Sequence, residues 1–391
     1  MKKVKLFLAL FLSFLAVLVL VDYLILNKIE AKATSDITNS SFNHNFWGNK
    51  TDYELFTSSN NFYSEILEPS GFNGAILVSR GGRIIFEKYA GLSELTKGIP
   101  IDSSTAFHLA SVSKTFTAMA ILKLRDMALV NINEPAWKYL PEFPFKSISI
   151  RHLLNHRSGL PNYLNFVEKL GWDKNKVLTN KNLLHLINRN SRKLTVGQPD
   201  KLFEYCNTNY ALLALIVEQV SNLSYAEFLK VHFFHPLGMN NSFVFEPGME
   251  KKVLPSYKSN NKVEPYMFLD EIYGDKNVYS SVRDLKKWDE ALYENKLFSG
   301  ATLEEAFRGY SYEKKGIRNY GLGWRMIERP NTKKIIYHNG WWHGNNTVFT
   351  RFPEDSTAII VLGNKYNIKI YQARKIAGVL KGYDIQWDEE N

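Results

Sequence analysis

Segments with strand character lie near both ends of this 391-residue chain, and helical patterns fill the stretch between them. A first pair of strands is expected at residues 75–78 and 83–86, around Gly81 and Gly82, which accept the positive φ angles of a tight hairpin. Later strands are expected at four apolar runs, residues 321–326, 335–338, 347–350 and 358–362. This order predicts one antiparallel sheet assembled from distant parts of the chain, with a helical lobe inserted.

The helices that this order requires are visible as apolar residues at helical spacing. They are expected at residues 115–129, 150–155, 180–188, 210–220, 225–234 and 284–288. A first helix at residues 52–67, stopped by Pro69, precedes the sheet, and a closing helix at residues 367–381 follows it. The predicted fold class is therefore α/β, of the α+β kind, with an antiparallel sheet flanked by helices.

The two lobes are expected to divide the chain unevenly. The sheet lobe would comprise about residues 52–110 and 275–391, and the helical lobe about residues 111–274. The cleft between the two lobes is the default position for a functional site.

The N-terminus has the character of an export signal. Three lysines among residues 1–5 precede an uncharged apolar run at residues 6–21, which a short apolar segment extends after Asp22. The length lies between that of a signal-peptide core and that of a membrane span. Residues 1–33 are therefore expected to be either a cleaved signal peptide or an anchor that inserts residues 4–26 into the membrane.

Either role of the N-terminus predicts the same location for the rest of the chain. Because the lysines stay on the cytoplasmic side, the following residues are exported, so the protein would be periplasmic, bound to the cell envelope or secreted. The polar residues 34–51 are expected to form a linker, and residues 52–391 the folded domain.

Composition excludes several classes of protein. A hydrophobic share of 45% and an aromatic share of 14% exclude disorder. The formal net charge is +10, but the basic residues are scattered rather than clustered, so nucleic acid is not an expected partner. Because Cys206 is the single cysteine, no disulfide can form within the chain.

Ser111 and Lys114 begin the apolar helix at residues 115–129. Their spacing places both side chains on one face of a helix, which is the arrangement of a nucleophile beside a base. The same spacing recurs at residues 259–262 and 311–314, although those segments are polar and have no apolar run behind them. Spacing alone therefore leaves open a serine and a lysine that merely face water.

Two further short motifs lie downstream. Tyr205 and Asn207 stand just before the helix at residues 210–220, where a tyrosine can relay a proton and an asparagine can bind an amide or ester. His338 ends one strand, and the glycine at Gly340 lets the backbone approach a ligand, so that the next N–H, that of Trp341, can face a developing oxyanion. Structural roles for the tyrosine and the histidine remain open at this point.

A metal site is the alternative to these catalytic roles. His152 and His156 have a spacing that suits a metal, and His338 lies near His343. Neither pair carries the carboxylate partner that metalloprotease motifs require, so no metal ligand is predicted.

With Ser111-x-x-Lys114, Tyr205-x-Asn207 and His338-x-Gly340 in this order, the chain resembles the serine beta-lactamase and penicillin-binding protein family. The branch concerned holds class C beta-lactamases, D-alanyl-D-alanine carboxypeptidases, D-amino-acid peptidases and related esterases. Segments that resemble the family framework lie at residues 153–161, 235–239 and 280–285, and the resemblance extends from about residue 72 to residue 364.

The resemblance implies a role for each matched residue. Ser111 would be acylated, Lys114 and Tyr205 would form the proton-transfer pair, and Asn207 would bind the amide of the substrate. The backbone N–H groups of Ser111 and Trp341 would form the oxyanion hole. The implied fold is a sandwich of helices on an antiparallel sheet plus a helical lobe, and no metal or organic cofactor is implied.

Two departures from the family pattern bear on the substrate. Cys206 replaces the serine usual between Tyr205 and Asn207, which weakens a hydrogen bond and offers a reactive thiol in the cleft. His338 stands where many beta-lactamases have lysine, so a permanent cation is missing, and Arg351 is a candidate to supply it.

These departures leave the substrate class and one alternative function open. The substrate is expected to be a small molecule or a peptide, with peptidoglycan-derived peptides, D-amino-acid peptides, beta-lactams and esters as the candidates. The main hypothesis is an exported serine hydrolase that works through an acyl-enzyme. The alternative is a non-catalytic envelope-binding or sensor protein that keeps the same fold.

Overall fold

The computed structural model describes residues 49–293, 297–313, 316 and 318–385. The chain divides into two compact units, Met1–Tyr53 and Glu54–Asn391, and the fold that follows is that of the second. The export signal expected at residues 1–33 and nearly all of the expected linker lie outside the described residues. Within the described ranges, no helix combines the length and the apolar character that crossing a membrane requires.

One seven-stranded antiparallel sheet forms the centre of this unit, with the strand order β2-β1-β12-β11-β10-β9-β8. The strands are β1 (Gly74–Arg80), β2 (Arg83–Ala90), β8 (Arg318–Tyr320), β9 (Arg325–Ile327), β10 (Ile335–Trp342), β11 (Asn345–Phe352) and β12 (Thr357–Gly363). The N-terminal hairpin thus pairs with the last strand of the chain, and the predicted fold class is confirmed. Two small sheets join β3 (Leu92–Glu94) to β4 (Ile99–Pro100) and β5 (Phe107–His108) to β7 (Val278–Ser280) and β6 (Phe243–Val244).

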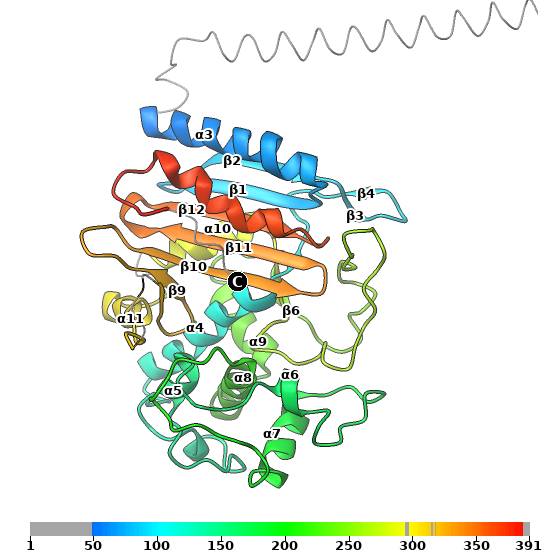
Figure 1. Ribbon diagram of the computed structural model, residues 1–391, viewed down its shortest axis with the longest axis vertical. Coiled ribbons are helices and arrows are strands. Elements are labelled where there is room, and N and C mark those ends of the chain that lie inside the picture. Colours follow the sequence, from blue (N-terminus) through cyan, green and yellow to red (C-terminus); the bar gives the residue numbers. More distant parts are fainter. Residues whose placement is uncertain (1–48, 294–296, 314–315, 317, 386–391) are drawn as a thin grey trace, which may run out of the picture. The chain divides into compact units, whose positions relative to one another are not determined.

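The helices occupy the middle of the chain, as their spacing predicts (Figure 1). The α-helices are α3 (Lys50–Phe62), α4 (Ser113–Asp126), α5 (Ile150–Leu154), α6 (Tyr163–Phe166), α7 (Asn180–Arg189), α8 (Asn207–Ser221), α9 (Tyr225–Leu229), α10 (Val282–Ala291) and α11 (Gly300–Ala306). Shorter or tighter turns are η1 (Tyr63–Leu67), η2 (Glu68–Ser70), η3 (Ala110–Val112), η4 (Ala136–Lys138), η5 (Lys230–Phe234), η6 (Pro353–Asp355) and η7 (Ile368–Val379). The sequence did not predict α6 or α11, which have only four and seven residues.

The structure differs from the prediction at residues 321–326, which do not form one strand. Gly323 has a φ of 89° and makes a turn there, so that β8 ends before it and β9 begins after it. β8 is three residues long and has no apolar alternation from which a strand could be predicted. The closing helix at residues 367–381 is present as η7, but it is a 3₁₀-helix.

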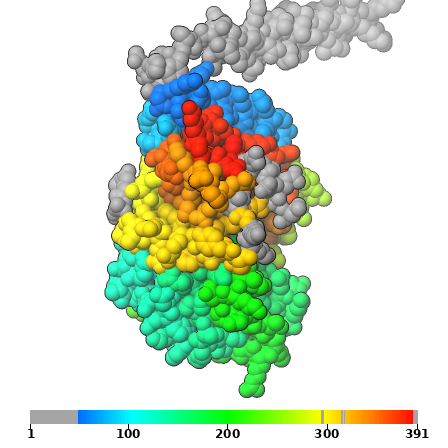
Figure 2. All heavy atoms as spheres, turned by 60° about the vertical axis from the view of Figure 1, so that its left-hand side comes forward, coloured from blue at the N-terminus to red at the C-terminus, as the bar shows by residue number. Residues whose placement is uncertain are grey.

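Helices cover both faces of the sheet. On one face η7 packs on β11, and Phe56 of α3 meets Phe86 of β2 with ring centres 6.0 Å apart. On the other face α10 packs on β12 and β1, while η3 packs on β10. Figure 2 shows the blue N-terminal and red to orange C-terminal segments together in one lobe, and the cyan and green middle of the chain in the other.

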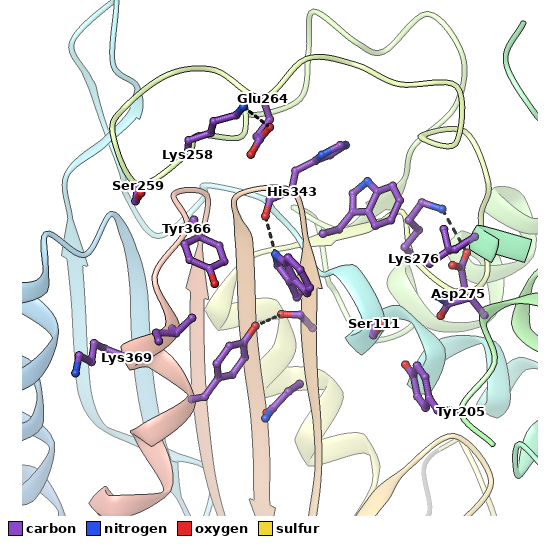
Figure 3. A pocket seen from close by; sticks show the side chains of 18 of the residues that line it. Ser111, Tyr205, Lys258, Ser259, Glu264, Asp275, Lys276, His343, Tyr366 and Lys369 are labelled. Carbon is purple, nitrogen blue, oxygen red and sulfur yellow. Dashed lines mark hydrogen bonds and ion pairs between the residues drawn. The ribbon is translucent and has the colours of Figure 1, made fainter. Parts of the chain in front are cut away.

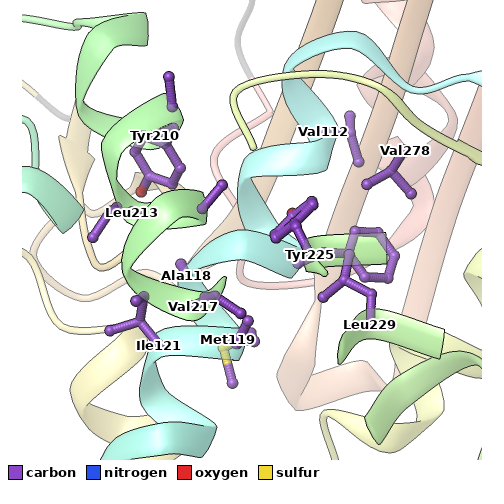
Figure 4. Close-up of a cluster of buried hydrophobic side chains, with 14 of the residues drawn as sticks. Val112, Ala118, Met119, Ile121, Tyr210, Leu213, Val217, Tyr225, Leu229 and Val278 are labelled. Carbon is purple, nitrogen blue, oxygen red and sulfur yellow. The ribbon is translucent and has the colours of Figure 1, made fainter. Parts of the chain in front are cut away.

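The hydrophobic core encloses α4 on all sides. Residues of η3 and α4 pack against α8 and α9, as Figure 4 shows for Met119, Val217 and Leu229. Eleven of the fourteen residues of α4 are buried, including Lys114. A helix enclosed in this way holds its first turn rigidly, and that turn carries the candidate base.

Candidate active site

Ser111 lies on η3, the turn that leads into α4. The preceding residue, Ala110, has a φ of 47°, a left-handed conformation that costs a residue with a Cβ about 1–2 kcal/mol. Its N–H donates to Nδ1 of His108 at 3.1 Å, so Nε2 of the same ring donates to Oδ1 of Asn277 at 2.9 Å. Burial lowers the pKa of His108 to about 4, which keeps the ring neutral and Nδ1 an acceptor. His108 therefore helps to hold the strained turn that presents Ser111.

Lys114 contacts the serine directly. Its Nζ donates to Oγ of Ser111 at 3.0 Å and to the backbone carbonyl of Asp275 at 2.8 Å, and its side chain is fully buried. The same nitrogen lies 5.0 Å from the centre of the Tyr205 ring. The structure thus brings together the three side chains that the sequence analysis assigned to proton transfer.

Tyr205 and Asn207 reach the site from the start of α8, and both line the same cavity as Ser111. Oδ1 of Asn207 is buried and has no hydrogen-bond partner within the described ranges, which leaves an acceptor for the N–H of a bound molecule. Cys206 points into the core instead. It is 2% exposed, and burial raises the pKa of its thiol to about 11. The prediction of a reactive thiol in the cleft is therefore wrong.

β10 passes directly beside the turn that carries Ser111. A Cβ on Gly340 would lie 2.5 Å from the carbonyl oxygen of Leu109 and 2.9 Å from the nitrogen of Ser111, so only glycine fits. Thr347 of β11 ties the two elements together, because its hydroxyl donates to the same Leu109 carbonyl at 2.8 Å. Trp341 follows Gly340 on the strand, and the two residues that were predicted to supply oxyanion donors are thus carried by adjacent elements.

His338 lies on β10 but does not line the cavity. Its side chain is fully buried, with Nδ1 donating to the backbone carbonyl of Asn339 at 2.7 Å and Nε2 accepting from the Tyr320 hydroxyl at 3.3 Å. Burial, reinforced by the positive charges of Arg325 and Lys114, lowers the pKa of His338 well below its usual value. The ring is therefore neutral and lies behind the site.

Arginine side chains occupy positions that the sequence could not reveal. Arg351, the candidate for the missing charge, is 1% exposed, and its Nε donates to Oδ1 of Asp289 at 2.5 Å, so it does not reach the cavity. Arg325 of β9 lines the cavity instead, with its guanidinium 4.9 Å from the centre of the Tyr205 ring. The candidate substrate-facing cation is therefore Arg325, and the suggestion of Arg351 is wrong.

A loop at residues 274–278, which carries no recognisable sequence motif, completes the site. Three hydrogen bonds fasten it to α4: Lys114 Nζ to the Asp275 carbonyl at 2.8 Å, the Thr117 hydroxyl to the Gly274 carbonyl at 2.6 Å, and the Val278 N–H to the Ser113 hydroxyl at 3.0 Å. No local pattern predicts such a contact, because about 160 residues separate the loop from the helix.

The loop brings a buried ion pair to the cavity. Nζ of Lys276 lies 3.7 Å from Oδ1 of Asp275 and donates to the Tyr163 hydroxyl at 2.7 Å, which in turn donates to Oδ2 of Asp275 at 2.9 Å. The ammonium also lies 4.6 Å from the centre of the Trp342 ring. Burial lowers the pKa of Lys276, although the Asp275 charge opposes this shift.

The cavity that these residues line has a volume of about 1240 Å³. Figure 3 shows Ser111 and Tyr205 at one end of it and Tyr366 and Lys369 at the other. Five cationic side chains line it, those of Lys258, Lys276, Arg325, Lys369 and Arg374, against two carboxylates, those of Glu264 and Asp275. A space of this size accepts more than a small acyl group, and its charge favours an anionic ligand.

The family model described as Beta-lactamase matches residues 63–380 of the chain. The chain belongs to the beta-lactamase family. Among its curated relatives, penicillin-binding protein 4* of Bacillus subtilis is 33% identical over 76% of this chain and 69% of the relative. Teichoic acid D-alanine hydrolase of Staphylococcus aureus is 27% identical over 80% of this chain and 76% of the relative. The octameric penicillin-binding protein homologue of Pyrococcus abyssi has a similar structure, with a TM-score of 0.71 and 26% identity over 83% of this chain and 76% of that one.

Membership of the beta-lactamase family makes this protein a serine hydrolase. The other histidines with metal-like spacing have protein partners. Nδ1 of His152 accepts from the Ser149 N–H, Nδ1 of His156 accepts from the Cys206 N–H, and Nε2 of His343 bonds to Asp270. Over the described part of the chain, no cluster of three or more histidine, cysteine or acidic side chains is arranged to hold a metal ion.

Proposed function

We propose that this protein is an exported serine hydrolase that cleaves D-aminoacyl esters or amides of the cell envelope through an acyl-enzyme on Ser111. The observation that carries the proposal is the 3.0 Å hydrogen bond between Lys114 Nζ and Ser111 Oγ at the wall of a large cavity. The name of the Staphylococcus aureus relative, a teichoic acid D-alanine hydrolase, supports the choice of the acyl group.

The proposed reaction has two halves. In the first, the Ser111 oxygen attacks the carbonyl carbon while Lys114 takes the hydroxyl proton. The bond to the leaving alcohol or amine then breaks, and Tyr205 delivers a proton to that group. In the second half, Tyr205 takes a proton from the water that attacks the acyl-enzyme, the acid leaves, and Lys114 returns its proton to the Ser111 oxygen. The N–H groups of Ser111 and Trp341 would bind the oxyanion in both halves.

Asn207 and Arg325 are proposed to orient the substrate. The unpaired Oδ1 of Asn207 suits the N–H of an amide or amino group, and Arg325 suits an anionic group. Because the neutral His338 ring lies behind the site, it is proposed to support Tyr205 rather than to touch the substrate; the two ring centres are 6.2 Å apart. Arg325, rather than residue 338, is proposed to supply the permanent cation for an anionic substrate group.

The test is covalent labelling with a fluorescent fluorophosphonate, followed by turnover of three substrates side by side: a D-alanyl ester, a D-amino-acid amide and nitrocefin. Labelling is expected for the parent protein and absent for Ser111→Ala. The matched control is Ser259→Ala, because Ser259 lines the same cavity and also precedes a lysine by three residues. Labelling that survives in Ser111→Ala would contradict the assignment, and tight ligand retention without turnover would favour the non-catalytic alternative.

Export through the N-terminal segment is part of the proposal. Residues 1–33 would direct residues 52–391 across the membrane and would be either removed or kept as an anchor through residues 4–26. Fractionation of cells that express the full chain, compared with cells that express a variant without residues 1–33, tests this step. Hydrolase activity outside the cytoplasm in the full chain alone is the expected result.

A further inference from the structure

The cavity has a second part on the other side of β10 from the serine. Side chains on opposite faces of β10 line the two parts. Gly340 faces Ser111, as the space around its Cα shows, and side chains alternate along a strand, so Trp341 faces the opposite way. We call the part lined by Trp341, Tyr366, Ile368, Lys369 and Lys258 the outer arm. Figure 3 places Tyr366, Lys369 and Lys258 away from Ser111 in the same cavity.

The outer arm is an exposed apolar surface that is held in position. The side chain of Trp341 is 65% exposed, that of Ile368 is 56% exposed and that of Tyr366 is 40% exposed. The indole N–H of Trp341 donates to the His343 carbonyl at 2.9 Å, and its ring meets the Tyr366 ring with centres 6.3 Å apart. Because a hydrogen bond already holds the Trp341 ring, a ligand that packs on this ring loses less side-chain entropy.

Positive charges flank this apolar surface. Lys369 is exposed next to Ile368. Lys258 reaches the outer arm from another loop, where its Nζ lies 3.7 Å from Oε2 of Glu264. With two lysines and one carboxylate, that of Glu264, this part of the cavity has a positive net charge beside its aromatic rings. Aromatic faces bind the C–H groups of sugars and polyols, and lysines bind phosphate oxygens.

We propose that the outer arm binds the polymer part of the substrate, an anionic chain of sugar or polyol phosphates, while Ser111 acts on an acyl group that this chain carries. The inference rests on the proposed function and adds the class of the alcohol component. Binding energy from this remote contact would hold the ester bond at the serine. An uncharged glycan bearing a peptide is a different occupant, and the experiment distinguishes the two.

The first test separates polymer from small substrate. In Tyr366→Ala/Lys369→Ala, the KM for a D-alanylated glycerol phosphate polymer is expected to rise about tenfold or more, the change that the loss of about 1.4 kcal/mol of binding free energy produces. The kcat for the polymer and the kcat/KM for D-alanine methyl ester are expected to stay the same. The matched control is Tyr312→Ala/Lys381→Ala, which removes an exposed tyrosine and an exposed lysine that do not line the cavity. An equal loss for both substrates, or for neither, would overturn the proposal.

The second test measures binding without chemistry. Ser111→Ala protein is titrated calorimetrically with a glycerol phosphate polymer that carries no D-alanine, and separately with a disaccharide peptide from peptidoglycan. Salt-dependent binding of the polymer, weakened by Tyr366→Ala/Lys369→Ala, is the expected result. Binding of the disaccharide peptide alone would overturn the proposal. If the parent hydrolyses no ester yet its Ser111→Ala form binds the polymer, the proposed function fails while the outer arm stands; the reverse outcome rejects the outer arm alone.

Discussion

The contact between Gly340 and the turn of Ser111 gives the sharpest prediction. In Gly340→Ala, the new Cβ would lie 2.5 Å from the Leu109 carbonyl oxygen, whereas ordinary contacts of this kind begin at 3.4 Å. The nearest atom is the Thr347 hydroxyl oxygen, at 2.3 Å, and even if that side chain moves, the contacts with the backbone of Leu109 and Ser111 remain. Strand and turn must therefore separate by roughly 1 Å. Overpacking of this kind costs about 1–3 kcal/mol of stability. Misplacement of a catalytic group by this distance costs about 100-fold in rate.

The assay for Gly340→Ala is the rate of acylation by the fluorophosphonate probe, measured together with thermal unfolding. We expect the acylation rate to fall about 100-fold while the melting temperature falls by several degrees, so that the protein stays folded at the assay temperature. Gly197→Ala is the control, because a Cβ there would lie 3.5 Å from the nearest atom and Gly197 does not have a positive φ. A Gly340→Ala protein that keeps its acylation rate and melting temperature would refute the close approach of β10 to Ser111.

Three further predictions concern buried groups. The pKa of His108 is about 4 in the folded protein and about 6.5 in the unfolded chain. The stability that depends on its neutral form should therefore be complete above pH 6.5 and decline as the pH falls toward 4, with a loss of about 2 kcal/mol at pH 5. Urea unfolding of the parent and of His108→Gln over this pH range would measure the loss. Asp289→Asn should lower the free energy of unfolding by about 3–5 kcal/mol, because it leaves the buried Arg351 guanidinium without its anion. In the same unfolding assay, the double variant Asp289→Leu/Arg351→Met should recover part of this loss. Cys206 should react with iodoacetamide only after denaturant is added, as mass spectrometry would detect, and rapid alkylation of the native protein would contradict its burial.

The sequence predicted the parts of the site that depend on local spacing. Ser111 and Lys114 share one helical face, and the short motif at the start of α8 brings Tyr205 and Asn207 to the cavity, because such relations are set within a few residues. The same is true of the apolar strands and long helices. β8 was not predicted, because a strand of three mostly polar residues shows no apolar alternation.

Contacts made across long distances in the chain could not be predicted. Asp275 and Lys276 enter the site because their loop bonds to α4, and Arg325 enters it because β9 pairs with β10. The position of His338 on a strand was predicted, but its side chain points behind Tyr205, and the neutral ring follows from burial that no sequence pattern reveals. Which side of the sheet a given side chain points to depends on the strand register and on which face is covered, and both are properties of the whole fold.

The pairing of β1 with β12 has a consequence for biosynthesis. Gly74 is the register partner of Gly363, so the free edge of β1 has no neighbour until almost the entire chain has left the ribosome. An apolar strand exposed for that time is prone to associate with other chains. Because β12 lies between β1 and β11, a nonsense mutation after β11 would leave an edge of each strand unpaired and yield an aggregating fragment rather than a weakened enzyme.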